Sequence, residues 1–92
     1  MTFSQFLKSE QPVNSPVLRA IKLTAQGSWH EAHDIVDRSQ DELSMWLHAL
    51  LHKIEGDTFN AGYWYRRAGK ENSHLEVMEE LENIYQEFSM SR

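Results

Sequence analysis

The chain lacks cysteine, and this absence restricts both its covalent chemistry and its metal chemistry. None of its 92 residues is a cysteine, so disulfides and thiolate metal sites are excluded, and any metal must have nitrogen and oxygen ligands. No apolar run is long enough to span a bilayer, and the opening MTFSQFLKSEQPV lacks the basic start and apolar middle of a signal peptide. We therefore expect a cytoplasmic protein with no membrane association.

Basic charge is also scarce. The chain has 9 lysines and arginines against 14 aspartates and glutamates, which gives a net charge of −5. Nucleic-acid binding needs basic surface to neutralise phosphates, and the local pair Arg66-Arg67 is too small to provide it, so we expect no nucleic-acid partner. Glycine-rich phosphate loops and the G-x-S-x-G motif are absent too, which leaves kinase, dinucleotide and serine-triad chemistry unsupported.

What the sequence does contain is helical periodicity throughout. Apolar residues recur three and four positions apart, and no stretch alternates apolar and polar residues as a strand would. A chain of this length supports one modest core, so we expect a single all-α domain over residues 1–92 with about five helices. We divide it into an N-terminal segment 1–14, a hairpin 15–38, a second hairpin 40–69 and a capping C-terminal helix 73–90.

Capping signals support these divisions. Helix starts are predicted at Ser15 before Pro16, at Ser28 with Glu31 as a capping box, and at Ser73 with Glu76 as another. Gly27 and Gly56 are expected to end helices, and the short turns around them favour antiparallel helical hairpins.

The second hairpin resembles a tetratricopeptide repeat. The resemblance covers about half the chain and rests on MWLHALLHKIEGDTFNAGYWYRRAG, with Ala49 at the close helix contact, a Gly-Asp turn, and Ala61, Tyr65 and Ala68 on the second helix. The segment QGSWHEAHDIV repeats the pattern more weakly, with Gly27 and Gly56 29 residues apart against the family's usual spacing of about 34. The resemblance implies a non-catalytic module whose inter-hairpin groove binds a protein or peptide partner, or another copy of the chain.

A second resemblance covers Trp29 to Gly69. The set W-x-E-A-H, followed by H-A-x-L-H-x-x-E-G-D-x-x-N-A-x-Y-W-Y-R-R-A-G, is similar to a group of small uncharacterised microbial proteins. This resemblance implies no activity.

Histidines and acids gather in two stretches, WHEAHD and HALLHKIEGD. His48, His52 and Glu55 fall at i, i+4 and i+7, on one stripe of a predicted helix. If the two helices pack side by side, His33 meets this stripe, and Asp37 could orient its ring. The three histidines and Glu55 then form a candidate site for a divalent metal such as zinc, manganese, iron or nickel.

Two explanations of the histidines remain open at this point. In the first, they are packing residues at the margin of the core, each making one hydrogen bond, and the protein is the binding module described above. In the second, the chain is a small metal-dependent or histidine acid/base enzyme acting on a small molecule.

The sequence also suggests roles for two further groups of polar residues. Asp57, Asn60, Tyr63 and Arg67 are candidate ligand- or partner-binding residues, although Asp57 and Asn60 could equally serve the start of a helix. The glutamates of the last helix are expected to form a solvated outer face: Glu76, Glu79, Glu80, Glu82 and Glu87.

Overall fold

The protein is all-helical. The computed structural model describes residues 1–90 and contains six helices there and no strand: α1 (Phe3–Lys8), α2 (Pro16–Ala25), α3 (Trp29–Asp37), α4 (Glu42–Ile54), α5 (Thr58–Ala68) and α6 (Val77–Met90). The predicted all-α fold is confirmed. The helix beyond the five expected is α1, a short helix in the N-terminal segment. It begins with a capping box between Thr2 and Gln5.

Short polar turns place α2 against α3 and α4 against α5 as antiparallel hairpins. Gly27 and Gly56 end α2 and α4 with φ of 82° and 83°, a backbone region that glycine enters without steric cost. At the start of α5 the Asp57 carboxylate accepts the backbone N–H of Asn60 at 3.1 Å. The helix ends predicted from glycine and aspartate are therefore present.

Both predicted capping boxes are absent, and the absence of the second changes a helix boundary. Ser28 stands at the N-cap of α3 without a side-chain cap bond. The last helix begins at Val77 instead of near Ser73, because hydrogen bonds to other parts of the chain hold Ser73 outside the helix. Lys53 Nζ donates to the Ser73 carbonyl at 2.9 Å, and the Ser73 hydroxyl faces Glu80 Oε1 at 3.5 Å.

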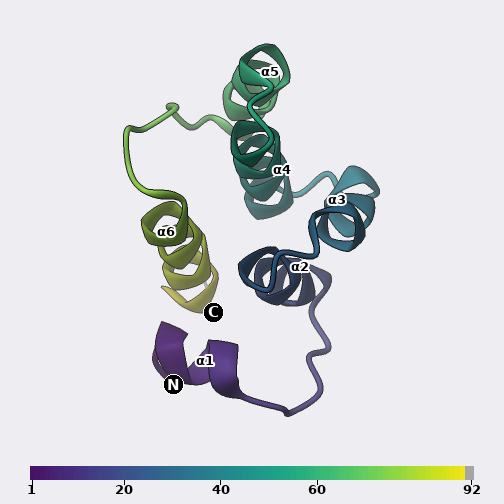
Figure 1. Cartoon of the computed structure of the whole chain (residues 1–92), viewed down its shortest axis with the longest axis vertical. Coiled ribbons are helices and arrows are strands. Elements are labelled where there is room, and N and C mark those ends of the chain that lie inside the picture. Colours follow the sequence, from purple (N-terminus) through teal and green to yellow (C-terminus); the bar gives the residue numbers. More distant parts are fainter. Residues whose placement is uncertain (91–92) are drawn as a thin grey trace.

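The hairpins stack side by side through α3 and α4, and α6 packs across α4 and α2 (Figure 1). The core lies where these elements meet, with its largest apolar side chains from α2, α4 and α6: Ile21, Leu47, Leu50, Leu51, Leu81 and Ile84. The C-terminal helix thus covers the hairpins as expected. No helix within residues 1–90 is both long enough and apolar enough to cross a membrane.

The N-terminal segment is docked on the last helix. Phe3 and Phe6 of α1 lie against the Tyr85 ring of α6, with ring centroids 5.4 and 4.8 Å apart. Lys22 of α2 donates to the backbone carbonyl of Ser9 just beyond α1. The two ends of the described chain therefore lie together at one end of the molecule, opposite α5 (Figure 1).

Candidate functional site

Three histidines meet at the contact between α3 and α4. His33 comes from α3, and His48 and His52 are one turn apart on α4. The His33 ring centroid lies 4.7 Å from that of His48 and 5.3 Å from that of His52, and the two α4 rings are 5.0 Å apart. One ring nitrogen of each histidine lies within 4.8 Å of the others. We call these residues the histidine cluster.

Two tryptophans hold the rings of this cluster in place. Trp29, one turn before His33 on α3, stacks on the His33 ring at 4.8 Å with planes 8° apart. Trp64 of α5 stacks on His48 at 3.9 Å and 13°. The Trp29 indole N–H donates to the Leu51 carbonyl at 2.7 Å, which fixes that ring against α4. Neither tryptophan was predicted from the sequence to be a site residue, although the four-residue spacing from Trp29 to His33 indicates that the two side chains are neighbours on one helix face.

His48 is buried without a hydrogen-bond partner for one ring nitrogen. Its side chain is 1% exposed, and Nδ1 is the one buried side-chain polar atom in residues 1–90 that has no partner. Burial lowers the pKa of His48 to about 4, and the neighbouring His33 and His52 add to the effect. At neutral pH the ring is therefore uncharged, and a neutral imidazole has a lone pair with which to ligate a metal.

His52 is oriented by a carboxylate. Its Nδ1 lies 2.7 Å from Glu55 Oε1 at the C-terminal end of α4. A neutral His52 that donates from Nδ1 to Glu55 leaves its other ring nitrogen, Nε2, as an acceptor, which is how carboxylates fix the tautomer of metal-ligating histidines. The structure thus places Glu55 beside the cluster as the partner of His52. Glu55 also forms a second group of neighbouring ligand atoms with His52 and Asp57.

Asp37 makes no hydrogen bond to His33 in the described part of the chain. Its charge acts instead on His48, whose pKa it raises slightly against the larger lowering by burial. The expected orientation of the His33 ring by a carboxylate is therefore replaced by the stack on Trp29.

The four ligand- or partner-binding candidates separate into two pairs. Asp57 and Asn60 bond to each other, through the Asn60 backbone N–H at 3.1 Å and its side-chain amide at 2.7 Å, and these bonds lower the pKa of Asp57. Arg67 donates to the Tyr63 hydroxyl at 3.1 Å on the outer face of α5. The first pair serves the helix start, whereas the second is exposed.

A surface groove lies elsewhere, within the first hairpin. It encloses about 520 Å³ between α2 and α3, and its lining carries both signs of charge, with Arg19 and Arg38 as well as Glu31 and Asp34. None of these residues was predicted from the sequence to bind a ligand or partner, and none of the candidates discussed above lines this groove.

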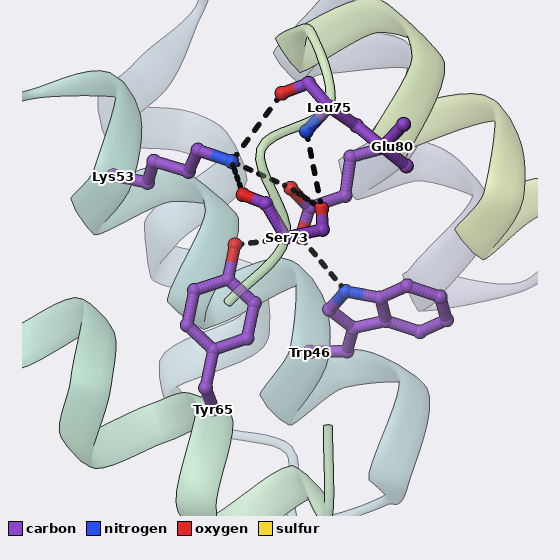
Figure 2. Close-up of polar contacts among 6 residues, drawn as sticks. All are labelled: Trp46, Lys53, Tyr65, Ser73, Leu75 and Glu80. Carbon is purple, nitrogen blue, oxygen red and sulfur yellow. Dashed lines mark hydrogen bonds and ion pairs between the residues drawn. The ribbon is translucent and has the colours of Figure 1, made fainter. Parts of the chain in front are cut away.

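A second buried polar cluster joins α4, α5 and α6 around Glu80, which we call the Glu80 cluster (Figure 2). The Glu80 carboxylate is 1% exposed and accepts from Trp46 Nε1 at 3.0 Å, the Tyr65 hydroxyl at 2.6 Å and Lys53 Nζ at 3.0 Å. The prediction that Glu80 lies on a solvated face is wrong. Burial, reinforced by the bond to Glu80, raises the pKa of Tyr65, so the phenol stays protonated and donates.

Comparison of the chain with known protein families, with curated protein sequences and with solved structures finds no match.

Proposed function

We propose that the protein binds a divalent metal ion through His33, His48 and His52. The observation that carries this proposal is the convergence of three imidazoles from two helices, and one of them, His48, also has a buried ring nitrogen without a partner. Glu55 would hold His52 in the ligating tautomer.

The dimensions of the histidine cluster support this proposal. Zinc binds imidazole nitrogen at about 2.0–2.1 Å, so tetrahedral ligands stand about 3.3 Å apart. The ring nitrogens lie within 4.8 Å of one another, and small rotations of His33 and His52 would close that gap. Imidazole suits zinc, iron and nickel, whereas manganese favours oxygen ligands. Among the four candidate metals we therefore favour zinc, iron and nickel over manganese.

The unpartnered nitrogen favours a ligand over packing alone. A buried polar atom left without a partner costs about 1–3 kcal/mol, and such atoms are rare in native proteins. If His48 served only to fill space between α4 and α5, an apolar side chain would do so without that cost. A metal ion bound at His48 Nδ1 would remove that cost by using its lone pair.

Three protein ligands leave one coordination position for water or a small molecule. A metal in such a position can polarise a carbonyl or lower the pKa of bound water, so a metal-dependent enzyme is compatible with the site. Metal-free acid/base catalysis by His48 has less support. A group whose pKa is about 4 is a weak base at neutral pH, where a catalytic base works best with a pKa near that of the medium.

The test is elemental analysis of untagged protein purified without chelators and without an immobilised-metal column. We expect about one metal ion per chain, as a three-ligand site implies, and zinc titration should give the same stoichiometry. Replacement of His33 or His52 by alanine should remove most of the bound metal. The matched control is His74→Ala, because His74 lies outside the cluster before α6. Equal zinc affinity in all three variants would show that the cluster is not the site.

A second candidate function is association with a protein partner, as the tetratricopeptide resemblance implies. The observation that favours it is the outer face of α5, where Phe59 is 82% exposed and Tyr63 is 41% exposed. Aromatic side chains and arginine are enriched at protein interfaces, and Arg67 lies beside Tyr63 on this face.

A further inference from the structure

The outer face of α5 carries a stripe of three residues spaced four apart, Phe59, Tyr63 and Arg67, which we call the α5 stripe. The opposite side of the helix packs on α4 through Ala61 and Tyr65. Figure 1 shows α5 at one end of the array, with no helix beyond it. In stacked helical arrays the terminal surface is normally polar, so an exposed phenylalanine there calls for an explanation.

Charge is divided between the two ends of α5. The helix contains no acidic residue, and its two arginines, Arg66 and Arg67, stand in its last turn. Two acids, Glu55 and Asp57, come just before its first turn. Acidic charge therefore precedes the start of α5 and basic charge stands at its end, and an 11-residue helix separates the two by about 16 Å.

We infer that the α5 stripe is the contact between two copies of this chain, with their α5 helices antiparallel around a two-fold axis at Tyr63. In that register Phe59 of each copy faces Arg67 of the other, because both lie four residues from Tyr63. The acidic end of each helix then lies against the basic end of the second copy. The same residues serve on both sides, so the contact is self-complementary and closes as a dimer.

The side chains are already arranged for this contact. Arg67 is held by the Tyr63 hydroxyl at 3.1 Å and lies 5.2 Å from the centre of the Trp64 ring. A side chain that is ordered before association loses less entropy on binding. Its guanidinium group would then meet the Phe59 ring of the second copy, a cation–π contact that strengthens as water is excluded.

The contact is small. Two short helices bury less area than the roughly 1,200 Å² that marks the lower end of stable interfaces. We therefore expect a reversible dimer that assembles between about 10 µM and 1 mM. This inference deepens the second candidate function and is independent of metal binding, since none of the three stripe residues belongs to the histidine cluster.

The first experiment measures mass against concentration by sedimentation. The wild-type chain should move from monomer to dimer, and Phe59→Lys should remain monomeric, because lysine would face Arg67 of the second copy. Adding Arg67→Glu to Phe59→Lys should restore association by pairing opposite charges across the axis. The matched control is Met78→Lys, which adds the same charge at a residue of α6 that is 45% exposed and should leave the dimer intact.

The second experiment determines whether the two α5 helices are antiparallel. Because the chain has no native cysteine, only an introduced cysteine can form a disulfide. Tyr63→Cys should form an intermolecular disulfide under mild oxidation, because residues on the axis face each other within the reach of the bond. Phe59→Cys should not, since the two copies of that residue would be about 12 Å apart along the helices. In a parallel contact both variants would link, because every residue of the stripe would face its own copy.

A wild-type chain that is monomeric at about 1 mM, or a Phe59→Cys chain that links as fast as Tyr63→Cys or faster, would overturn the inference. Metal content measured on the same Phe59→Lys and Met78→Lys samples keeps the two proposals separate. It should stay at the wild-type value whether or not the copies associate.

Discussion

The histidine cluster and the Glu80 cluster are both buried, both polar and both built on α4, yet they differ in how their polar atoms are satisfied. Glu80 accepts from three donors on two other elements. His48 is equally buried but leaves Nδ1 without a partner. A polar network that is complete stabilises the fold by itself. An incomplete one is where a ligand can add what is missing. This difference is why we propose a binding role for the histidine cluster and a structural role for the Glu80 cluster.

The largest expected effect breaks the complete network. Glu80→Ala leaves Trp46 and Tyr65 as buried donors without an acceptor and removes the counter-charge of Lys53. We expect a loss of about 3–5 kcal/mol in the free energy of unfolding, measured by urea denaturation. Glu82→Ala on the exposed face of α6 is the control and should change stability by less than about 0.5 kcal/mol. A similar loss in both variants would mean that the network contributes nothing special.

Acid should weaken the fold through the incomplete cluster. The pKa of His48 is about 4 in the folded chain against 6.5 for the free side chain, so between these values the unfolded chain binds more protons. Stability is therefore fully present above pH 6.5 and falls as the pH drops to 4, by up to about 3 kcal/mol. Urea unfolding at several pH values measures the slope. The slope should flatten in His48→Leu, and an unchanged slope would assign it to other groups.

Metal should stabilise the wild-type chain and distinguish the two clusters further. Zinc at about 100 times its dissociation constant adds about 2.7 kcal/mol, a rise in melting temperature of about 10 °C or more for a chain of this size. His33→Ala should lose this increment. Glu80→Ala should keep it despite its lower starting stability, provided that enough of it is folded to bind. Equal increments in wild type and His33→Ala would count against the site.

The smallest expected effect is also the most discriminating. In metal-free protein at pH 7, His48→Leu should leave stability unchanged or raise it by about 1 kcal/mol, because the substitution removes a buried nitrogen that has no partner. If His48 were purely a packing residue fitted to Trp64, loss of the stack would lower stability instead. Thermal unfolding with and without chelator compares these outcomes, and the leucine variant should no longer respond to zinc.

Much of the fold could be predicted because its signals are local. Helix starts such as Ser15 and Asp57, and the turns at Gly27 and Gly56, depend on residues a few positions apart, and all of them are present. The false start at Ser73 shows the limit of such signals. Ser73 and Glu76 have the local pattern of a capping box. Lys53, 20 residues earlier, nevertheless holds Ser73 in a non-helical segment by donating to its carbonyl.

The sites were predictable to different degrees. The spacing of His48 and His52 placed them on one stripe, and hairpin packing brought His33 to it. Glu80 was missed even though it lies three residues after Val77 and four before Ile84, on the apolar side of α6. Its donors are 15 to 34 residues away in the chain, and no periodicity in the sequence indicates such distant partners.

The three tryptophans of the chain have an optical consequence. Trp29 and Trp64 lie flat on imidazoles of the histidine cluster, whereas Trp46 donates to Glu80. Indole emission is quenched by a charged imidazole and shifts when the ring's surroundings change. Each cluster therefore contains at least one native tryptophan fluorophore. In a Trp46→Phe chain only Trp29 and Trp64 remain, so intrinsic tryptophan fluorescence would report occupancy of the histidine cluster without any added label.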